Sequence, residues 1–291
     1  MRTIAIHTSK GGVGKTTLTV NFSYELAKIG HKVLVIDLDD QANSSLYLGV
    51  NKADDFNKAK GIDEFNKILN SFRDRKELID FLKADIDSPE FDYKEYIRES
   101  SFNELIHQTT PSSQGRIDVL PGSYRTKEDE NLNQVAGGGG IRQNRLYRAL
   151  CKSEIVNLYD YVIIDTPPNL NMVGSNGLYA ARYLIIPTQM EYFSVYGVNS
   201  VIANIKRTVQ FDTDGQRGKV LGIVPMMTDP KGKNRINKFA NQLLKQTVPS
   251  EIEVFPEIKR TTYFADAAKD RLPISFFAEK KPRAAGQAAM Q

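Results

Sequence analysis

The stretch KGGVGKTT at residues 10–17 constrains the fold more than any other part of the sequence. Residues 3–8, before it, form a β-branched run that predicts a strand. After it, apolar residues recur at the spacing of one helix face, at Leu18, Phe22, Leu26 and Ile29. Gly30 ends this helix, which is predicted to begin near Lys15. A strand, a glycine-rich loop and a helix in this order predict an α/β fold with the positive end of the helix aimed at the loop.

The residue types of the loop suit a chain of phosphates. Glycines at 11, 12 and 14 let backbone N–H groups turn inward, because no Cβ stands in the way. Lys15 supplies a full charge to the outer phosphates, and Thr16 offers a hydroxyl to Mg²⁺. The predicted nucleotide-binding residues of the loop are Lys10, Gly11, Gly12, Val13, Gly14, Lys15, Thr16 and Thr17.

The loop departs from the common phosphate-loop pattern at its start. Ser9 stands where the pattern has glycine, and a second lysine, Lys10, precedes the glycines. This is the deviant Walker motif. The alternative, a tight strand-to-helix turn without a ligand, fits a lone Gly-x-Gly better than this complete series.

Acidic residues follow two other apolar runs that predict parallel strands. Asp37, Asp39 and Asp40 come at or after HKVLVID, and Asp165 ends YDYVIID. Carboxyl ends of parallel strands meet at one sheet edge, so these carboxylates are expected to face one Mg-nucleotide. The predicted metal ligands are Thr16, Asp39 and Asp165. A strand-end aspartate can also cap a helix or form a turn, which is the expectation for Asp40, and Asp37 is left open between a structural role and support of the metal.

The rest of the chain predicts a doubly wound, mostly parallel sheet with helices on both faces. Strands are expected at 116–120, around YDYVIID, at YLIIPT and at KVLGIVPMM, and helices near 141–158, 173–181, 195–209 and 235–246. Residues 50–115 are highly charged and predict a helical insertion rather than a sheet. Gly137–Gly140 predicts a mobile loop. The whole chain, 1–291, is expected to be a single domain.

Composition excludes several classes of protein. One cysteine, Cys151, permits neither an intrachain disulfide nor a cysteine-only metal site. No apolar run approaches the ~20 residues of a membrane span, and the first residues lack the features of a signal peptide. The cytoplasm is therefore the expected location.

Charge is distributed unevenly around a net of +4. Residues 219–283 hold 13 Lys/Arg against 7 Asp/Glu, whereas residues 52–99 hold 10 against 13. A basic region of this kind can bind nucleic-acid phosphates, although such residues are often simply a solvated face. The candidate DNA-binding residues are Lys231, Lys233, Arg235, Lys238, Arg260, Lys280, Lys281 and Arg283.

With these motifs the chain resembles the ParA family of partition ATPases, within the ParA/MinD group. The stretches that carry the resemblance are KGGVGKTT (10–17), VLVIDLDDQANSSLYLG (33–49), DYVIIDTPPNL (160–170), LIIPTQMEYFSVYGV (184–198) and GIVPMMTDPKGKNR (222–235), with a weaker match over 256–274. They cover most of the chain outside 50–115. The helix-turn-helix domain of larger members is not seen before the first strand, so operator binding is not expected.

The resemblance implies a homodimer of two ATP-bound subunits that binds DNA without sequence preference. It implies that Lys10 reaches the partner's nucleotide, that Lys15 and Thr16 bind the phosphates and Mg²⁺, and that Asp39 positions the hydrolytic water. It also implies that Asp165 is the Walker B aspartate. A ParB-like centromere-binding protein is then expected to stimulate ATP hydrolysis, and the protein to associate with the nucleoid. The usual Asp-Pro-Gln reads Asp39-Asp40-Gln41 here, and a second carboxylate is expected to slow hydrolysis or shift the local metal electrostatics.

Three alternatives accompany this interpretation. A MinD-like membrane ATPase would need a basic amphipathic C-terminal helix, which Pro282 and Gly286 interrupt. A nitrogenase-type iron–sulfur reductase would need bridging cysteines, and a nucleotide-switched scaffold would bind ATP and DNA but barely hydrolyse. Adenine contacts are assigned to Met226 and Tyr263, for which ordinary core packing is the competing explanation.

Overall fold

The computed structural model describes residues 1–50, 60–64, 66, 76–123, 143–152, 154–169, 171–209, 215–231 and 233–280. Within these residues one sheet has the strand order β3-β4-β2-β5-β1-β6-β7-β8, with β9 also paired to β7. All pairings are parallel except that of β3 with β4. The strands are β1 Arg2–Ile6, β2 Lys32–Asp37, β3 Arg98–Glu99, β4 Arg116–Leu120, β5 Tyr161–Asp165, β6 Tyr183–Gln189, β7 Lys219–Thr228, β8 Glu253–Val254 and β9 Ile258–Lys259.

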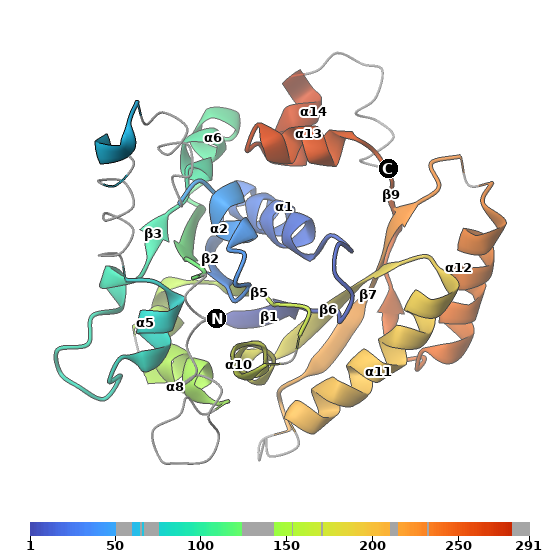
Figure 1. Cartoon of the computed structure of the whole chain (residues 1–291), viewed down its shortest axis with the longest axis horizontal. Helices are drawn as coiled ribbons and strands as arrows, with labels where there is room; N and C mark the ends of the chain where they lie inside the picture. The colour runs from blue at the N-terminus through green and yellow to red at the C-terminus, as the bar shows by residue number, and fades with distance from the viewer. Residues whose placement is uncertain are drawn as a thin grey trace.

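Helices cover both faces of this sheet (Figure 1). On one face lie α1 Lys15–Lys28, α2 Asn43–Tyr47, α6 Phe102–Thr109, α13 Tyr263–Lys269 and α14 Ile274–Lys280. On the other lie α5 Leu78–Lys83, α8 Arg145–Lys152, α10 Met172–Ala180, α11 Tyr192–Thr208 and α12 Arg235–Thr247. The remaining short helices are η1 Tyr93–Glu95 and α9 Ile155–Leu158, and residues 62–64 are helical as well. The predicted doubly wound fold is therefore confirmed.

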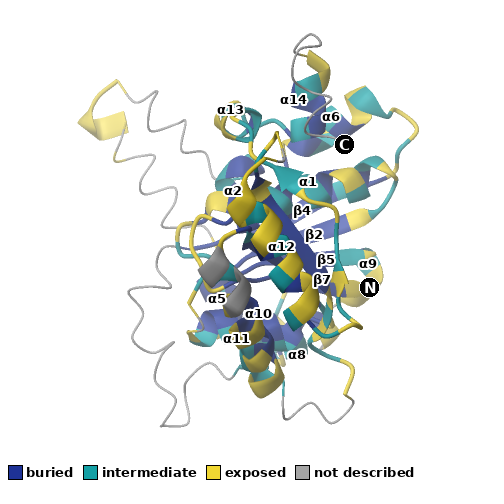
Figure 2. Ribbon diagram, turned by 90° about the vertical axis from the view of Figure 1, so that its right-hand side faces the viewer, coloured by how far each residue is buried: buried dark blue, intermediate teal, exposed yellow. Residues whose placement is uncertain are grey.

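The central strands are apolar on both sides because helices bury both. In β1, Ile4 and Ile6 belong to the core beneath α1, whereas Ala5 belongs to the core on the opposite face. This alternation follows from the two-residue period of a strand. Figure 2 shows the consequence, with buried strands inside and the outward residues of α12 exposed. None of the described helices is long and apolar enough to cross a bilayer.

The segment 50–115 is helical at α5, η1 and α6, as predicted, but it also contributes a strand. Arg98–Glu99 pairs antiparallel with β4. This strand was not predicted, because the whole segment was expected to be helical. Beyond this pair, Asn103 accepts a hydrogen bond from the Ile117 N–H (2.8 Å) and donates to its carbonyl (3.1 Å). The backbone N–H of Ser100 also donates to this carbonyl (3.0 Å), so one backbone group and one side-chain amide continue the edge of β4. A strand of two residues is too short to show the alternation by which a strand is recognised in a sequence.

Other differences concern helix boundaries and short elements. The helix predicted over 141–158 is two helices, α8 and α9, and residues 141–142 lie outside the described part. The loop Gly137–Gly140 also lies outside it. The elements α2, β8, β9, α13 and α14 were not predicted, because the two strands have two residues each and the three helices, at seven residues or fewer, span at most two turns and show no clear apolar spacing.

Candidate nucleotide site

The glycine-rich loop connects β1 to α1 and adopts a conformation that its glycines make possible. Gly12 and Gly14 have φ angles of 70° and 100°, in the left-handed region that residues with a Cβ rarely enter. A Cβ on Gly11 or Gly12 would meet no atom within 4 Å, so open space lies over the loop. Gly14 caps α1 without any side-chain hydrogen bond, which leaves the first N–H groups of the helix for a ligand.

Met226, a predicted adenine contact, lies against this loop. A Cβ on Gly14 would stand 2.8 Å from its Cε atom, so the third glycine makes room for the methionine. Met226 is 3% exposed and packs in the core beneath α1. Its observed contact is therefore with the loop, and its contact with adenine stays a prediction.

Lys15 points back into the loop. Its Nζ atom donates to the carbonyls of Thr8 (3.5 Å) and Lys10 (3.4 Å), and the residue is 8% exposed. Burial lowers the pKa of this ammonium, and the nearby carboxylates of Asp165 and Asp39 oppose that shift. A cation held by long hydrogen bonds inside the loop is well placed to neutralise phosphates above it.

Asp165, at the end of β5, lies against Thr16, so the structure brings two of the three predicted metal ligands together. Its Oδ2 atom accepts hydrogen bonds from the hydroxyls of Thr16 (2.8 Å) and Ser44. Its Oδ1 atom is buried and has no hydrogen-bond partner among the described residues. Burial raises the pKa of Asp165 to about 6, which these hydroxyls and Lys15 partly oppose.

This arrangement fits a magnesium ion bound together with phosphates. Mg²⁺ keeps several waters and takes one or two carboxylates in such sites. Among the described residues, no group of three or more His, Cys, Asp or Glu could hold a metal ion. The open oxygen of Asp165 and the Thr16 hydroxyl suit two of the three predicted ligands, and the binding of Mg²⁺ by these residues and by Asp39 stays a prediction.

Asp37, Asp39 and Asp40 separate into different roles at the end of β2. The carboxylate of Asp37 is fully buried and accepts from Ser45 N (2.9 Å), Ser45 Oγ (2.7 Å) and Asp39 N (3.2 Å). Burial, followed by the charge of Asp165, raises its pKa to about 7. Its oxygens are occupied by the chain itself, which is a structural role, while support of the metal stays a prediction.

Asp39 is half-buried and forms a turn, since its Oδ1 atom accepts from Gln41 N (3.0 Å). Burial is the main cause that raises its pKa, and the neighbouring Asp40 carboxylate raises it further. The Asp40 carboxylate, which stands in place of the usual proline, thus contributes to the raised pKa of Asp39, while its predicted effect on hydrolysis or on the metal stays a prediction. Asp40 itself binds the Gln41 side chain (3.1 Å), as a turn residue does.

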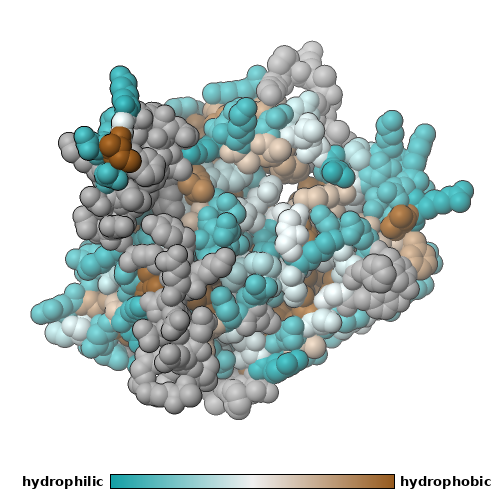
Figure 3. Space-filling model, viewed as in Figure 1, coloured by the Kyte–Doolittle hydropathy of each residue, from teal (hydrophilic) through white to brown (hydrophobic). Residues whose placement is uncertain are grey.

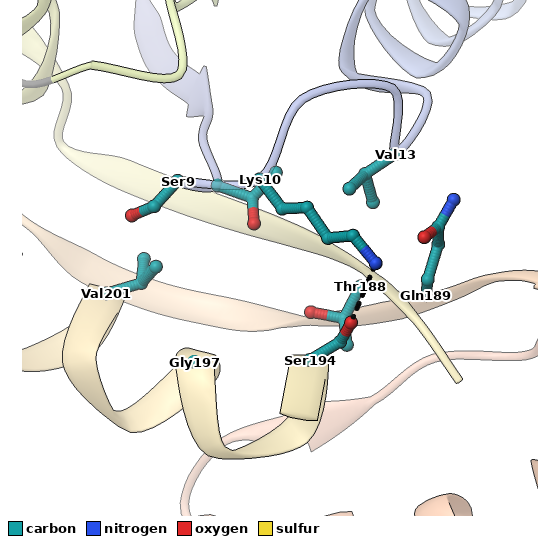
Figure 4. Close-up of a pocket in the computed structure, with 9 residues that line it drawn as sticks. Ser9, Lys10, Val13, Thr188, Gln189, Ser194, Gly197 and Val201 are labelled. Atoms are coloured by element: carbon teal, nitrogen blue, oxygen red, sulfur yellow. Dashed lines mark hydrogen bonds between the residues drawn. The ribbon is translucent and has the colours of Figure 1, made fainter. Parts of the chain in front are cut away.

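Lys10 turns away from the loop toward the start of α11 (Figure 4). Its ammonium donates to Glu191 Oε2 (2.7 Å) and to Ser194 Oγ (3.3 Å). It lies beside a cavity of about 350 Å³ between the loop, the end of β6 and α11. The residues that line the cavity are Thr8, Ser9, Lys10, Val13, Thr188, Gln189, Ser194, Gly197 and Val201.

The predicted DNA-binding residues that the structure describes lie at several places. Lys231, Lys233 and Arg235 are exposed around the β7–α12 turn, which the carboxylate of Asp229 builds by accepting three backbone N–H groups. Figure 3 shows hydrophilic side chains at this upper right edge of the molecule. Lys238 and Arg260 are exposed as well, on α12 and after β9. Lys280 ends α14 with its ammonium 4.5 Å from the centre of the Phe276 ring, and Lys281 and Arg283 lie outside the described residues.

Tyr263, the other predicted adenine contact, begins α13. It is half-buried, and its ring lies 6.2 Å from that of Phe277. The structure therefore gives it packing within the C-terminal helices, while its role toward adenine stays a prediction.

Sequence reasoning missed three side chains that bond to predicted site residues. Ser44 binds Asp165, and Glu191 and Ser194 bind Lys10. All three lie in the family-like stretches 33–49 and 184–198. The signal that could have found Glu191 is its position just beyond a strand that ends at the ligand-binding edge.

Together, a glycine loop before a helix, a buried lysine in the loop, and an aspartate bonded to the loop threonine define a P-loop nucleotide site. The model of a family described as an AAA domain matches residues 1–214. The chain belongs to the ParA/Soj family of P-loop ATPases, in the ParA/MinD group. This confirms the resemblance inferred from the motifs.

Individual relatives agree with this placement. The chain is 32% identical over 209 residues to the sporulation initiation inhibitor protein Soj of Bacillus subtilis, a match that covers 71% of this chain and 65% of Soj. It is 28% identical over 278 residues to the chromosome-partitioning ATPase Soj of Treponema pallidum, covering 95% and 90%.

Solved structures share the fold. Apo McdA of Cyanothece superposes with a TM-score of 0.71 at 19% identity, over 100% of this chain and 98% of McdA. The septum site-determining protein MinD of Pyrococcus horikoshii, in complex with Mg-ADP, superposes with a TM-score of 0.63 at 21% identity, over 99% and 92%.

Proposed function

We propose that the chain is an ATP-dependent dimerising ATPase that binds DNA nonspecifically and drives the partition of a plasmid or chromosome. The observation that carries this proposal is Lys10. It is a second loop lysine whose ammonium bonds to Glu191 and Ser194 rather than within its own loop, with its side chain 46% exposed. A cation in this position can serve a nucleotide held by a second copy.

Within one subunit, the glycine loop and Lys15 would bind the phosphates, and Thr16 and Asp165 would hold Mg²⁺. The ion would neutralise charge on the β- and γ-phosphates. Asp39 would orient the attacking water, since its Oδ2 atom is not used by the Gln41 turn. Met226 and Tyr263 are proposed to flank the adenine.

Lys10 would exchange partners when two subunits meet. In the single chain its charge is balanced by Glu191, and in the dimer the phosphates of the partner's ATP would balance it instead. Phosphates carry more negative charge than one carboxylate, so ATP favours the exchange. Dimerisation and ATP binding are coupled in this way.

DNA binding is proposed for the exposed cations of the β7–α12 turn and its surroundings. Each phosphate contact by Lys or Arg releases counterions, which gives affinity without sequence preference. The proposed set is Lys231, Lys233, Arg235, Lys238, Arg260, Lys280 and Lys281.

Further parts of the proposal follow from the family. A ParB-like centromere-binding protein would stimulate hydrolysis, and the protein would act in the cytoplasm on the nucleoid. Residues 1–291 would work as one P-loop domain with an insertion at 50–115. The second candidate is a nucleotide-switched scaffold with very slow hydrolysis, which the raised pKa of Asp39 favours.

Lys10→Ala tests the proposal. Sedimentation velocity with no nucleotide, ADP or ATP plus Mg²⁺ is expected to show a wild-type dimer with ATP alone. The variant is expected to bind fluorescent ATP as the wild type does, yet to stay monomeric and to lose hydrolysis. A Lys10→Ala protein that dimerises and hydrolyses normally would refute the role of Lys10, and Lys231→Ala is a matched control for the loss of one exposed lysine.

A further inference from the structure

His7 is a buried histidine between β1 and the glycine loop that none of the roles above uses. Its exposed fraction is 0%, and its backbone N–H donates to Ile185 of β6 (3.1 Å). Its ring Nδ1 atom lies 2.8 Å from the hydroxyl oxygen of Thr166, the residue that follows Asp165. The ring therefore joins the strand end that carries the phosphate loop to the strand end that carries the proposed magnesium ligand.

The protons of this contact can be placed from the neighbouring hydrogen bond. The Thr166 hydroxyl donates its one proton to the carbonyl of Ile6 (2.9 Å), which can only accept. Toward His7 the hydroxyl must therefore accept, so Nδ1 carries the ring proton. The other ring nitrogen, Nε2, is then the acceptor of a neutral imidazole.

Nε2 has no partner among the described residues, although it is buried. Burial, followed by the charge of Lys15, lowers the pKa of His7 to about 4, which agrees with a neutral ring. An unpaired buried nitrogen costs stability, and a phenyl ring in the same place would avoid that cost. The Nδ1–H donor is the property that a space-filling residue would lack.

The His7–Thr166 hydrogen bond lies where a small displacement of the chain would change the position of Asp165. Ile6 and Asp165 are direct partners in the β1–β5 pairing, and Asp165 bonds to Thr16 of the loop on the other side. Groups that hold a metal ligand in place commonly contribute about 10- to 100-fold to metal affinity.

We propose that His7, as the neutral Nδ1–H tautomer, is a positioning residue for the magnesium site: by donating to Thr166 it fixes Asp165 relative to Thr16. This inference rests on the proposed Mg-nucleotide role of Asp165. His7 contacts neither substrate nor metal, and it acts through the strand end.

The tautomer can be tested in the wild-type protein without nucleotide. The chain has three histidines, so ¹⁵N NMR of histidine-labelled protein resolves few signals, and His7→Asn assigns that of His7. The expected signal has a protonated Nδ1 and a bare Nε2 and does not change between pH 6 and 8. A proton on Nε2, or titration in this range, would overturn the inference.

Variants test the positioning itself. His7→Phe keeps a ring but removes the donor, and we expect the Mg²⁺ concentration for half-maximal ATP hydrolysis to rise about 10-fold. Binding of fluorescent ATP in EDTA should stay within about twofold, because the glycine loop and Lys15 are unchanged. His7→Asn, whose amide N–H replaces Nδ1–H, should restore the wild-type Mg²⁺ requirement.

Thr166→Val removes the acceptor and is the matched variant. It should shift the Mg²⁺ requirement as His7→Phe does, and the double variant should shift it no further. An unchanged requirement in His7→Phe, an equal loss of ATP binding in EDTA, or failure of His7→Asn to rescue would overturn the inference. If the wild-type protein hydrolyses ATP without Mg²⁺, the proposed function is overturned instead. The NMR test of the His7 tautomer does not depend on that result.

Discussion

Replacing Glu191 by Gln should strengthen ATP-dependent dimerisation, because it weakens the contact that holds Lys10 within its own subunit. The two charges lie 2.7 Å apart, but their side chains are 46% and 60% exposed. Exposed pairs of this kind contribute about 0.5 kcal/mol after solvent screening. A dimer exchanges two such pairs, so the expected gain is about 1 kcal/mol, or about a fivefold lower dimer Kd.

The assay is sedimentation equilibrium with ATP and Mg²⁺, carried out in an Asp39→Ala background so that the nucleotide persists. Glu90→Gln is the matched control, since Glu90 is exposed on the 50–115 insertion and the substitution removes the same charge. The gain from Glu191→Gln should shrink between 0.05 and 0.5 M salt, because salt screens exposed pairs. The control should change the dimer Kd by less than about twofold.

Two results would refute this reasoning. If Glu191→Gln dimerises as tightly as wild type at low salt, the pair does not hold Lys10 back. If it dimerises more weakly, Glu191 stabilises the dimer interface.

Four further predictions concern the site and the basic surface. Asp39→Ala should bind ATP normally, lose hydrolysis by at least about 100-fold and remain on DNA, and steady-state turnover near wild type would contradict its role. Lys15→Ala should abolish nucleotide binding measured by calorimetry, because the phosphates lose their buried cation, and binding near the wild-type affinity would count against that role. Asp37 has a folded pKa of about 7 against an ordinary value of 3.8, so the folded state retains the proton and stability should fall as pH rises through this range. Asp37→Asn should therefore lose less stability than wild type between pH 5 and 8 in urea titrations, and equal losses would exclude the shift. Neutralising the basic residues of the β7–α12 turn should make log K for DNA binding fall less steeply with log salt, by about 0.9 in slope per lost phosphate contact. The residues to neutralise are Lys231, Lys233, Arg235 and Lys238. An unchanged slope would show that they do not belong to the DNA-binding surface.

The parts of the fold that could be predicted are those with a local pattern. Each of these features is recognised from residues that are neighbours in the sequence. They are KGGVGKTT, the apolar runs of the central strands and the strand-end position of Asp165. The Thr16–Asp165 contact then follows, because parallel strands place their carboxyl ends at one edge.

The parts that could not be predicted depend on distant contacts or on very short elements. Lys10 and Glu191 are 181 residues apart, and His7 and Thr166 are 159 apart, so only the packed sheet joins them. β3 has two paired residues, and the hydrogen bonds beyond it come from the Ser100 N–H and the side chain of Asn103 rather than from a longer strand. The break between α8 and α9 likewise leaves the apolar spacing of the sequence unchanged.

The central claim, that ATP switches this chain into a DNA-binding dimer, is tested most directly by DNA binding of the purified protein. Binding of duplexes of unrelated sequence should be compared with no nucleotide, with ADP and with ATP plus Mg²⁺, over a range of salt. The account predicts binding with ATP plus Mg²⁺ alone, equal for all sequences and falling steeply with salt. Equal DNA binding in all three nucleotide states, or none in any, would contradict it.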